Sequence, residues 1–355
     1  MKTPVLIFAF GGVAALAVAC SSSTTPTTTH DAAADGTVDA PVATDLSGPG
    51  PGTDTATADV PPGDATVTDG GDPKIARGLY LVNVLGCNNC HTPQVNGAPD
   101  PSMRLSGRDC FVSMPAGSCL SSANLTPDPT GIKNLSDEQL FAALRQGKYP
   151  VAQDGGTVYL FDNMPYYQYA NLTDEDVSAI AAYLRGLPAI NHTVMPPAGM
   201  FAARPTAAQS VPVPLADLPN ATPASDSATK GKYLAALACL NCHTVPATAD
   251  GGAVTPKHRD ASKAYQGGQA ATLTSDGGVK MFTSANLTPD MTGLKDWTRM
   301  NVVTAIKTAK DEMGRMLCPP MRANTAITDD DAGSIADYLR GIPPAASMQT
   351  SCNGP

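Results

Sequence analysis

Two copies of a five-residue pattern contain the residues of this sequence that are best suited to chemistry. Cys-Asn-Asn-Cys-His stands at residues 87–91, and Cys-Leu-Asn-Cys-His stands at residues 239–243. Two thiols three residues apart on a helical turn can both add to the vinyl groups at one edge of a porphyrin, and the adjacent histidine then offers a ring nitrogen to the iron. A single match would also suit half of a zinc site or a redox dithiol. The repetition favours two covalently bound haem c groups. The predicted attachment residues are Cys87, Cys90, His91, Cys239, Cys242 and His243.

Other patterns repeat around the two motifs and indicate two related units in tandem. Asn-Leu-Thr-Pro-Asp occupies residues 124–128 and again 286–290, and each copy is followed, after one residue, by Thr-Gly, an aliphatic residue and Lys. Residues 173–188 and 328–343 are identical at ten of sixteen positions, with a constant offset of 155. The spacing therefore predicts one unit over residues 73–188 and a second over 228–343.

Capping residues mark the starts of the first and middle helices of each unit. Asp72-Pro73 opens a helix that runs into the first motif, and Asp226 precedes the corresponding stretch of the second unit. The middle helix of the first unit is predicted to follow Ser136, with Gln139 three residues later completing a capping box. In the second unit Thr298 stands in the same place.

The last helix of each unit has both of its ends marked in the sequence. Thr173 and Thr328 are predicted N-caps, and acidic residues fill the first turn, where the helix dipole favours them. Gly186 and Gly341 are each followed by an aliphatic residue and a proline, which predicts that these helices stop there.

The order of these elements resembles the class I cytochrome c family. In each unit a helix leads into Cys-x-x-Cys-His, and a loop, a middle helix, a methionine and a final helix with Tyr-Leu-Arg-Gly-x-Pro follow. The resemblance covers residues 73–345, and the Asn-Leu-Thr-Pro-Asp element is also similar to that of haem subunits serving bacterial dehydrogenases. We therefore expect an all-α fold. The predicted segments are a signal peptide at 1–20, a disordered tether at 21–72, cytochrome c-like domains at 73–189 and 225–346, a Pro-rich linker at 190–224 and a C-terminal tail at 347–355.

The resemblance also implies a distal iron ligand just before each final helix, and methionine is a common choice in electron carriers. Met164, which precedes Pro165, has this position in the first unit. In the second unit Met321 is favoured because it follows two prolines and stands seven residues before the cap of the final helix, whereas Met316 and, in a bis-histidine site, His258 are alternatives. The predicted metal ligands are thus His91, Met164, His243 and Met321.

Several other residues have two possible roles or none that the sequence indicates. Phe161 and Tyr166 either flank the first haem or pack in the core. His30 and His192 have no motif around them. Four further cysteines cannot attach haem by spacing, and their even number in an exported chain suggests two disulfides. They are Cys110, Cys119, Cys318 and Cys352, for which we prefer the pairs 110–119 and 318–352 among three possible pairings.

The N-terminal residues predict export. A short positive region precedes an apolar run at residues 5–18, and Ala17-Val18-Ala19-Cys20 resembles a bacterial lipobox, although ordinary signal-peptide cleavage nearby is an alternative. We expect a lipid on Cys20 and, because Ser21 follows, anchorage at the outer membrane with the folded part facing the periplasm. Residues 21–72 have nine aspartates, no Lys or Arg and almost no large apolar side chain, as a disordered tether would.

The charge of the chain excludes one class of partner and leaves two classes of function. The net charge of −9 equals that of residues 21–72 alone, so the rest of the chain is nearly neutral and shows no basic patch for nucleic acid. The patterns favour an electron carrier, with a dehydrogenase or another redox protein as donor and an oxidase or another cytochrome as acceptor. The alternatives are a dihaem enzyme of peroxidase or thiosulfate-oxidising type and a zinc-binding adaptor.

Overall fold

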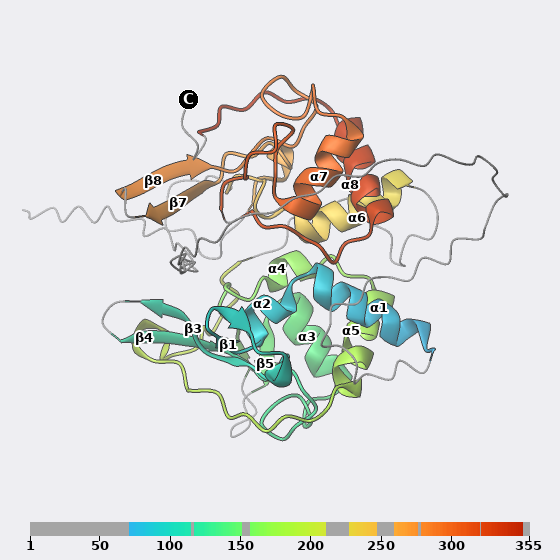
Figure 1. Cartoon of the computed structure of the whole chain (residues 1–355). Coiled ribbons are helices and arrows are strands. Elements are labelled where there is room, and N and C mark those ends of the chain that lie inside the picture. The colour runs from blue at the N-terminus through green and yellow to red at the C-terminus, as the bar shows by residue number, and fades with distance from the viewer. Residues whose placement is uncertain are drawn as a thin grey trace, which may run out of the picture.

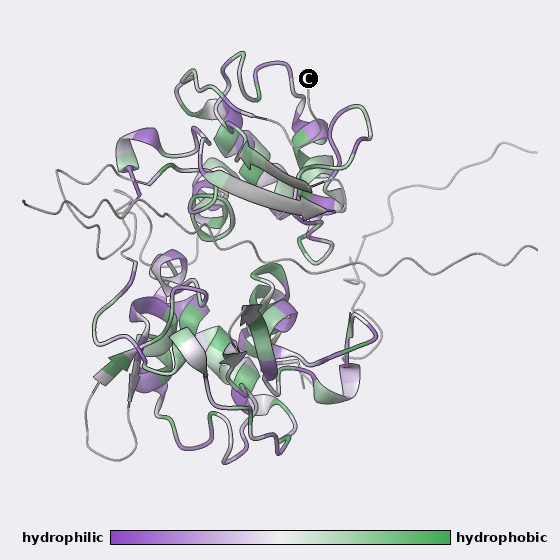
Figure 2. Cartoon of the chain, turned by 90° about the vertical axis from the view of Figure 1, so that its left-hand side faces the viewer, coloured by the Kyte–Doolittle hydropathy of each residue, from purple (hydrophilic) through white to green (hydrophobic). Residues whose placement is uncertain are grey.

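The computed structural model describes residues 71–114, 117–150, 157–210, 227–246, 259–275, 278–319 and 321–350, which form two lobes (Figure 1). The lobes remain one above the other when the molecule is turned by 90° (Figure 2). The predicted signal peptide with Cys20, nearly all of the predicted tether with His30, and Cys352 lie outside these residues. Within the described ranges, no helix is long and apolar enough to cross a membrane.

Corresponding helices build the two lobes. The first lobe contains α1 (Pro73–Val84), α2 (Cys87–His91), α3 (Asp137–Gln146), α4 (Tyr166–Tyr169) and α5 (Asp174–Gly186), and the second contains α6 (Ser227–Ala238), α7 (Arg299–Thr308) and α8 (Asp329–Gly341). Short 3-10 helices η1 (Pro101–Met103), η2 (Gly199–Phe201) and η3 (Ala261–Lys263) lie in the connections.

The predicted capping residues that lie within the described ranges do cap these helices, whereas Asp226, ahead of α6, lies outside those ranges. Ser136 and Gln139 form a reciprocal capping box at the start of α3, and Thr298 forms one with Asn301 at the start of α7. The side chains of Thr173 and Thr328 accept backbone hydrogen bonds at the starts of α5 and α8. Local side-chain chemistry therefore fixes where these helices begin.

The helices α5 and α8 end at the predicted residues, Gly186 and Gly341, but the glycines do not form left-handed caps. Gly186 and Gly341 belong to the last turns of these helices, and neither has a positive φ. The backbone becomes extended at the next residue, Leu187 in one lobe and Ile342 in the other, because the proline that follows disfavours the helical conformation of the residue before it. Proline rather than glycine terminates these helices.

The prediction of an all-α fold is wrong. Eight strands among the described residues pair into four two-stranded antiparallel sheets. They are β1 (Gln94–Val95), β2 (Ala98–Pro99), β3 (Arg108–Met114), β4 (Ser118–Ser122), β5 (Lys148–Pro150), β6 (Thr157–Tyr159), β7 (Ala270–Ser275) and β8 (Gly278–Thr283). The longest pairs, β3–β4 and β7–β8, fall in the less regular region after each motif. Asp276-Gly277, a dipeptide typical of tight hairpins, separates β7 from β8, whose residues include three threonines and one valine.

In each lobe the first and last helices cross at a glycine. A Cβ added to Gly78 in α1 would lie 2.0 Å from the carbonyl oxygen of Ala179 in α5. At the equivalent crossing, a Cβ on Gly231 in α6 would lie 1.9 Å from the carbonyl oxygen of Ser334 in α8. Only a residue without a side chain allows this approach, which places the helix before each motif directly against the final helix.

The core continues from one lobe into the other. A single cluster of buried side chains includes Leu81 and Tyr183 of the first lobe together with Tyr233 and Leu339 of the second. The described part of the linker, residues 190–210, follows the first lobe. Its Ala198 forms an isolated β-bridge with Cys119, which is disulfide-bonded to Cys110 as predicted.

Candidate haem sites

The first attachment motif forms a single helical turn, α2, directly after α1. Gly86 provides the left-handed residue between the two helices, with φ 72°. Thr92, which follows the motif, accepts a hydrogen bond from the N–H of Leu105 (3.0 Å), and the carbonyl of His91 accepts one from Gly107 (2.8 Å). These bonds hold both ends of the motif against the loop that follows it.

The second motif has the same supports in equivalent places. The N–H of His243 bonds to the carbonyl of Cys239 (3.0 Å), which closes a helical turn after α6. Thr244 accepts a bond from the N–H of Tyr265 (3.2 Å), and Gly267 donates to the carbonyl of His243 (2.8 Å). The repeat in the sequence is thus a repeat of the scaffold around each attachment turn.

Both motif histidines are oriented by a backbone carbonyl. Nδ1 of His91 lies 2.8 Å from the oxygen of Ala123, and Nδ1 of His243 lies 2.8 Å from the oxygen of Ala285. A carbonyl can only accept, so Nδ1 carries the hydrogen and Nε2 presents a lone pair. Burial lowers the pKa of both imidazoles, which keeps them neutral, as an iron ligand must be.

The Asn-Leu-Thr-Pro-Asp repeat positions these carbonyls, because it begins at the next residue. Asn124 donates its side-chain N–H to the oxygen of Ile190 (2.8 Å), and Asn286 does the same to Ala345 (2.7 Å), each in the segment after a final helix. A Cβ on Gly131 would lie only 2.4 Å from the oxygen of Thr126, so the loop is closed tightly. The repeat therefore ties the histidine-orienting carbonyl to the end of the lobe.

The four motif cysteines are chemically suited to thioether formation. None of them is in a disulfide, although Cys110 and Cys119 are. Burial raises the pKa of the Cys87 and Cys239 thiols to about 12. A protonated thiol is a weaker nucleophile than a thiolate.

The donor set of each motif fits a c-type haem better than a protein-built metal site. Each attachment turn offers two thiols and one imidazole with a free Nε2, which is the set that a covalent haem uses. In the described ranges, no three side chains among His, Cys, Asp and Glu are grouped so that they could hold a metal ion. His258, one alternative ligand, lies outside those ranges.

The predicted distal methionines differ in their surroundings. Met164 is partly buried and packs against the same hydrophobic cluster as Cys87. Met321 is 37% exposed, and its N–H bonds to the carbonyl of Cys318 (3.1 Å). Met316 is more exposed, at 59%, and pairs with Lys310 in an isolated β-bridge. Met164 thus packs against the core, whereas both candidates of the second lobe are more exposed, and the distal ligands of both lobes stay predictions.

Two arginines near the motifs had no signal in the sequence. Arg104 is half-buried and donates to the Asn83 side chain (3.0 Å) and to the Tyr183 hydroxyl (3.2 Å). Burial raises the pKa of Cys87 despite the opposing charge of Arg104, which lies close enough to act on that sulfur. In the second lobe Arg259 opposes the effect of burial on the pKa of Cys242 in the same way. One cation therefore accompanies each attachment turn.

The other residues that the sequence analysis singled out have defined contacts in the structure. Phe161 makes an edge-on contact with Phe201, with ring centroids 5.2 Å apart. Tyr166 is buried, and its hydroxyl accepts bonds from the backbone of Gln209 and Ser210. His192 lies 2.9 Å, through Nδ1, from the oxygen of Ser106 in the first lobe. Cys318 is disulfide-bonded, and its preferred partner Cys352 is beyond the described residues.

Comparison with known proteins identifies the family of the first unit. Residues 75–188 match the cytochrome c family. The chain is 28% identical over 308 residues to the cytochrome c subunit of a quinone alcohol dehydrogenase from Gluconobacter oxydans, which covers 79% of this chain and 57% of that protein. It is 41% identical to the cytochrome subunit of fructose dehydrogenase from Gluconobacter japonicus over 113 residues, 32% of this chain and 21% of that protein.

A third relative is matched over most of its own length. The chain is 26% identical over 286 residues to a diheme cytochrome c-type protein from Cereibacter sphaeroides, which covers 76% of this chain and 86% of that protein. By contrast, the chain spans only about three fifths of the length of the dehydrogenase subunits that it matches over most of its own length.

Proposed function

Because the chain contains a cytochrome c family domain at residues 75–188 and is homologous to cytochrome c subunits of dehydrogenases, we propose that it is a dihaem electron carrier. In this proposal it passes single electrons between a donor, such as a dehydrogenase, and a respiratory acceptor. The observation that supports it most strongly is the duplicated histidine geometry, in which a backbone carbonyl bonds Nδ1 of His91 and of His243 at the same distance of 2.8 Å.

The chain's own residues have three tasks at each site. When bound, haem supplies reversible one-electron chemistry at its iron. The thiols of the motif would hold it covalently, the carbonyl-bound histidine would present a fixed Nε2, and the glycine crossing holds the helix before the motif against the final helix. A methionine would serve as the second protein ligand of the iron and would raise its reduction potential.

We further propose Met164 and Met321 as the distal ligands. Met164 is supported by its place before the final helix and by its packing against the hydrophobic cluster that Cys87 also contacts. Met321 is supported by its equivalence to Met164, because the residue three positions after each methionine contacts the other lobe. After Met321, the side chain of Asn324 donates to the carbonyl of Val84 (2.9 Å). After Met164, the hydroxyl of Tyr167 accepts a hydrogen bond from Asn241. Met321→Ala should remove from one haem only the weak long-wavelength band of a ferric Met–His haem, whereas Met316→Ala should leave both bands. The opposite outcome would assign Met316.

A redox titration of the full chain tests the carrier function. Both haems are expected to be reduced and reoxidised reversibly at moderately high potential, to stay low-spin, and not to react with hydrogen peroxide. A five-coordinate haem that turns over peroxide would favour the dihaem enzyme instead.

The dehydrogenase partner is proposed from the relatives, whose names describe them as cytochrome subunits of alcohol, fructose and gluconate dehydrogenases. Mixing the oxidised chain with a candidate dehydrogenase and its substrate should reduce both haems at a rate that rises with dehydrogenase concentration. Reduction that does not depend on the dehydrogenase would contradict this partner.

We also propose that Cys20 carries lipid and holds the chain at the outer membrane on its periplasmic side. The lipobox-like residues 17–20 support this, and two acyl chains give stable anchoring where one is marginal. Cys20→Ser should move the protein into the soluble periplasmic fraction. Continued sedimentation with membranes would show that another anchor exists.

A further inference from the structure

The two lobes contact each other through a pair of equivalent hydrogen bonds. Tyr80 of α1 donates to Asp331 in the first turn of α8. Tyr233 of α6 donates to Asp176 in the first turn of α5 (2.8 Å) and also accepts from the N–H of Thr173 (3.2 Å). The tyrosines occupy matching positions of the repeat, as do the aspartates, so the interface has approximate twofold symmetry.

Each aspartate of this interface is also held by a cation of its own lobe. Arg77 binds both oxygens of Asp176, at 2.9 and 2.8 Å, and Lys230 lies 2.6 Å from Asp331. The two aspartates are almost completely buried, at 1% and 8% exposure. Buried carboxylates with both a cation and a hydroxyl partner fix the relative positions of the lobes firmly, because losing any one partner leaves a buried charge poorly compensated.

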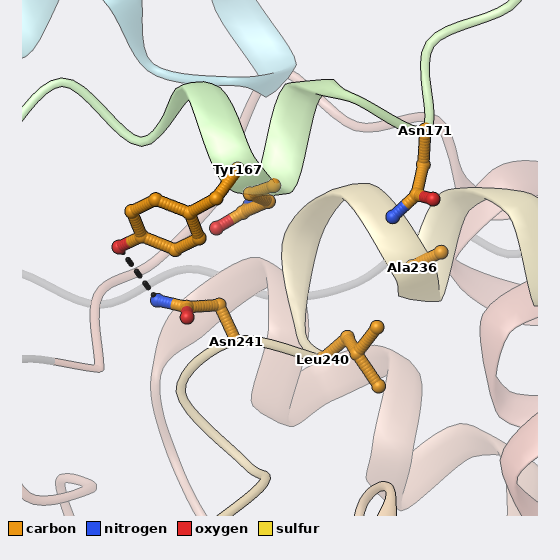
Figure 3. A pocket seen from close by; sticks show the side chains of 6 residues that line it. Tyr167, Asn171, Ala236, Leu240 and Asn241 are labelled. Carbon is orange, nitrogen blue, oxygen red and sulfur yellow. Dashed lines mark hydrogen bonds between the residues drawn. The ribbon is translucent and has the colours of Figure 1, made fainter. Parts of the chain in front are cut away.

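Closer to the haem sites, residues from the predicted distal segment of one lobe lie against the attachment segment of the other. Tyr167 in α4, three residues after Met164, accepts a hydrogen bond from Nδ2 of Asn241 (3.0 Å), and Asn241 stands between the two cysteines of the second motif. Figure 3 shows this bond at one side of a small cleft, where α4 faces Ala236 of α6 and Leu240, which follows that helix. Asn324 makes the reciprocal contact from the second lobe to the first: its side chain donates a hydrogen bond to the carbonyl of Val84, just before the first motif.

Asn241 also connects this contact to a charge. Its Oδ1 accepts a hydrogen bond from Nε of Arg259 (2.9 Å), so one amide side chain joins the Tyr167 hydroxyl to the Arg259 guanidinium. Arg259 is close enough to act electrostatically on Cys242 of the same motif. A residue of the first lobe thereby helps to set where a positive charge lies beside the second attachment turn.

We propose that Tyr167 is a positioning residue that couples the two haem sites, by holding Asn241 and Arg259 in place across the lobe interface. The inference rests on the dihaem function proposed above. A positive charge near a haem favours the ferrous state, so the contact raises the potential of the second haem and makes it depend on the first lobe. It also gives electrons a short path between the distal segment of one site and the attachment turn of the other.

The test is a redox titration of the full, haem-loaded chain carrying Tyr167→Phe, which removes the hydroxyl and keeps the ring. The potential of the second haem should fall, although the changed residue is in the first lobe, and electron redistribution between the haems after rapid partial reduction should slow severalfold. A chain without the first attachment pair, Cys87→Ala with Cys90→Ala, identifies which titration step belongs to the second haem. Tyr149→Phe is the matched control, since that ring stacks on Arg204 (5.3 Å) in the first lobe.

A double-mutant cycle makes the result specific. Arg259→Gln should lower the same potential, and adding Tyr167→Phe to it should lower it little further, because both changes act through one contact. The inference is overturned if Tyr167→Phe lowers the potential of the second haem no more than Tyr149→Phe does. It is also overturned if the potential shifts of Tyr167→Phe and Arg259→Gln simply add in the double variant. If neither haem of the unaltered chain is reversibly reduced, the proposed function fails instead.

Discussion

Replacing Gly78 by alanine tests how closely the first and last helices of a lobe must approach. The added Cβ would lie 2.0 Å from the oxygen of Ala179 and 2.7 Å from Cβ of Tyr183. Ordinary carbon–oxygen contacts are about 3.3–3.6 Å, so the two helices would have to separate. Overpacking of a well-packed core costs about 1–3 kcal/mol, and a backbone atom that cannot rotate away places this site at the upper end.

Helix propensity acts in the opposite direction, because alanine is favoured over glycine by about 1 kcal/mol inside a helix. The expected net loss for Gly78→Ala is therefore about 2 kcal/mol in the free energy of unfolding, the difference between about 3 and about 1. Denaturant unfolding of the haem-loaded chain, followed by far-ultraviolet circular dichroism, measures it.

Gly186→Ala is the matched control, since a Cβ added to this helical glycine of α5 would meet no other atom within 4 Å. It should leave stability unchanged or raise it by up to about 1 kcal/mol. Gly231 and Gly341 repeat the comparison in the second lobe. The reasoning is refuted if Gly78→Ala unfolds at the same denaturant concentration as Gly186→Ala.

Three further changes have defined outcomes. Tyr233→Phe removes a buried hydroxyl from Asp176 and should cost about 1.5–3 kcal/mol, measured by denaturant unfolding; an unchanged midpoint would contradict this. Hydrogen bonds from Thr292 lower the pKa of Asp290, so its contribution to stability is present above its ordinary pKa and is lost as the pH falls through the lowered value. Asp290→Asn should therefore weaken the acid sensitivity of unfolding at low pH, and an unaltered pH profile would count against it. Arg104→Gln should lower the potential of the first haem in a redox titration, because it removes a positive charge. Arg104→Lys keeps the charge and should leave that potential close to the value of the unaltered chain.

Features with local causes could be predicted from the sequence. The capping box at Ser136 and the N-cap at Thr298 are present as predicted, and Thr298 also forms a capping box with Asn301, because these contacts need only residues three positions apart. The attachment turns follow from the motif itself. The hairpins were not predicted, because helical periodicity dominates the pattern of each unit, although Asp276-Gly277 between β7 and β8 does carry a hairpin signal.

Contacts between distant residues could not be predicted in the same way. Tyr80 and Asp331 are 251 residues apart, and nothing near either of them indicates the other. The same holds for Tyr167 and Asn241, whose hydrogen bond depends on how two lobes dock. The repeat did contain a partial clue, since the tyrosine of each first helix and the aspartate of each final helix recur together, but repetition alone does not distinguish a bond within a unit from one between units.

The most direct test of the account is the number of haems bound covalently to one chain. The pyridine haemochrome spectrum and the intact mass of the purified protein should both give two haems, each attached through two thioethers. Removing either cysteine pair, Cys87 with Cys90 or Cys239 with Cys242, should leave one haem with its spectrum intact. A chain that carries one haem or none, or that loses both when a single pair is removed, would contradict the proposal of two equivalent haem sites.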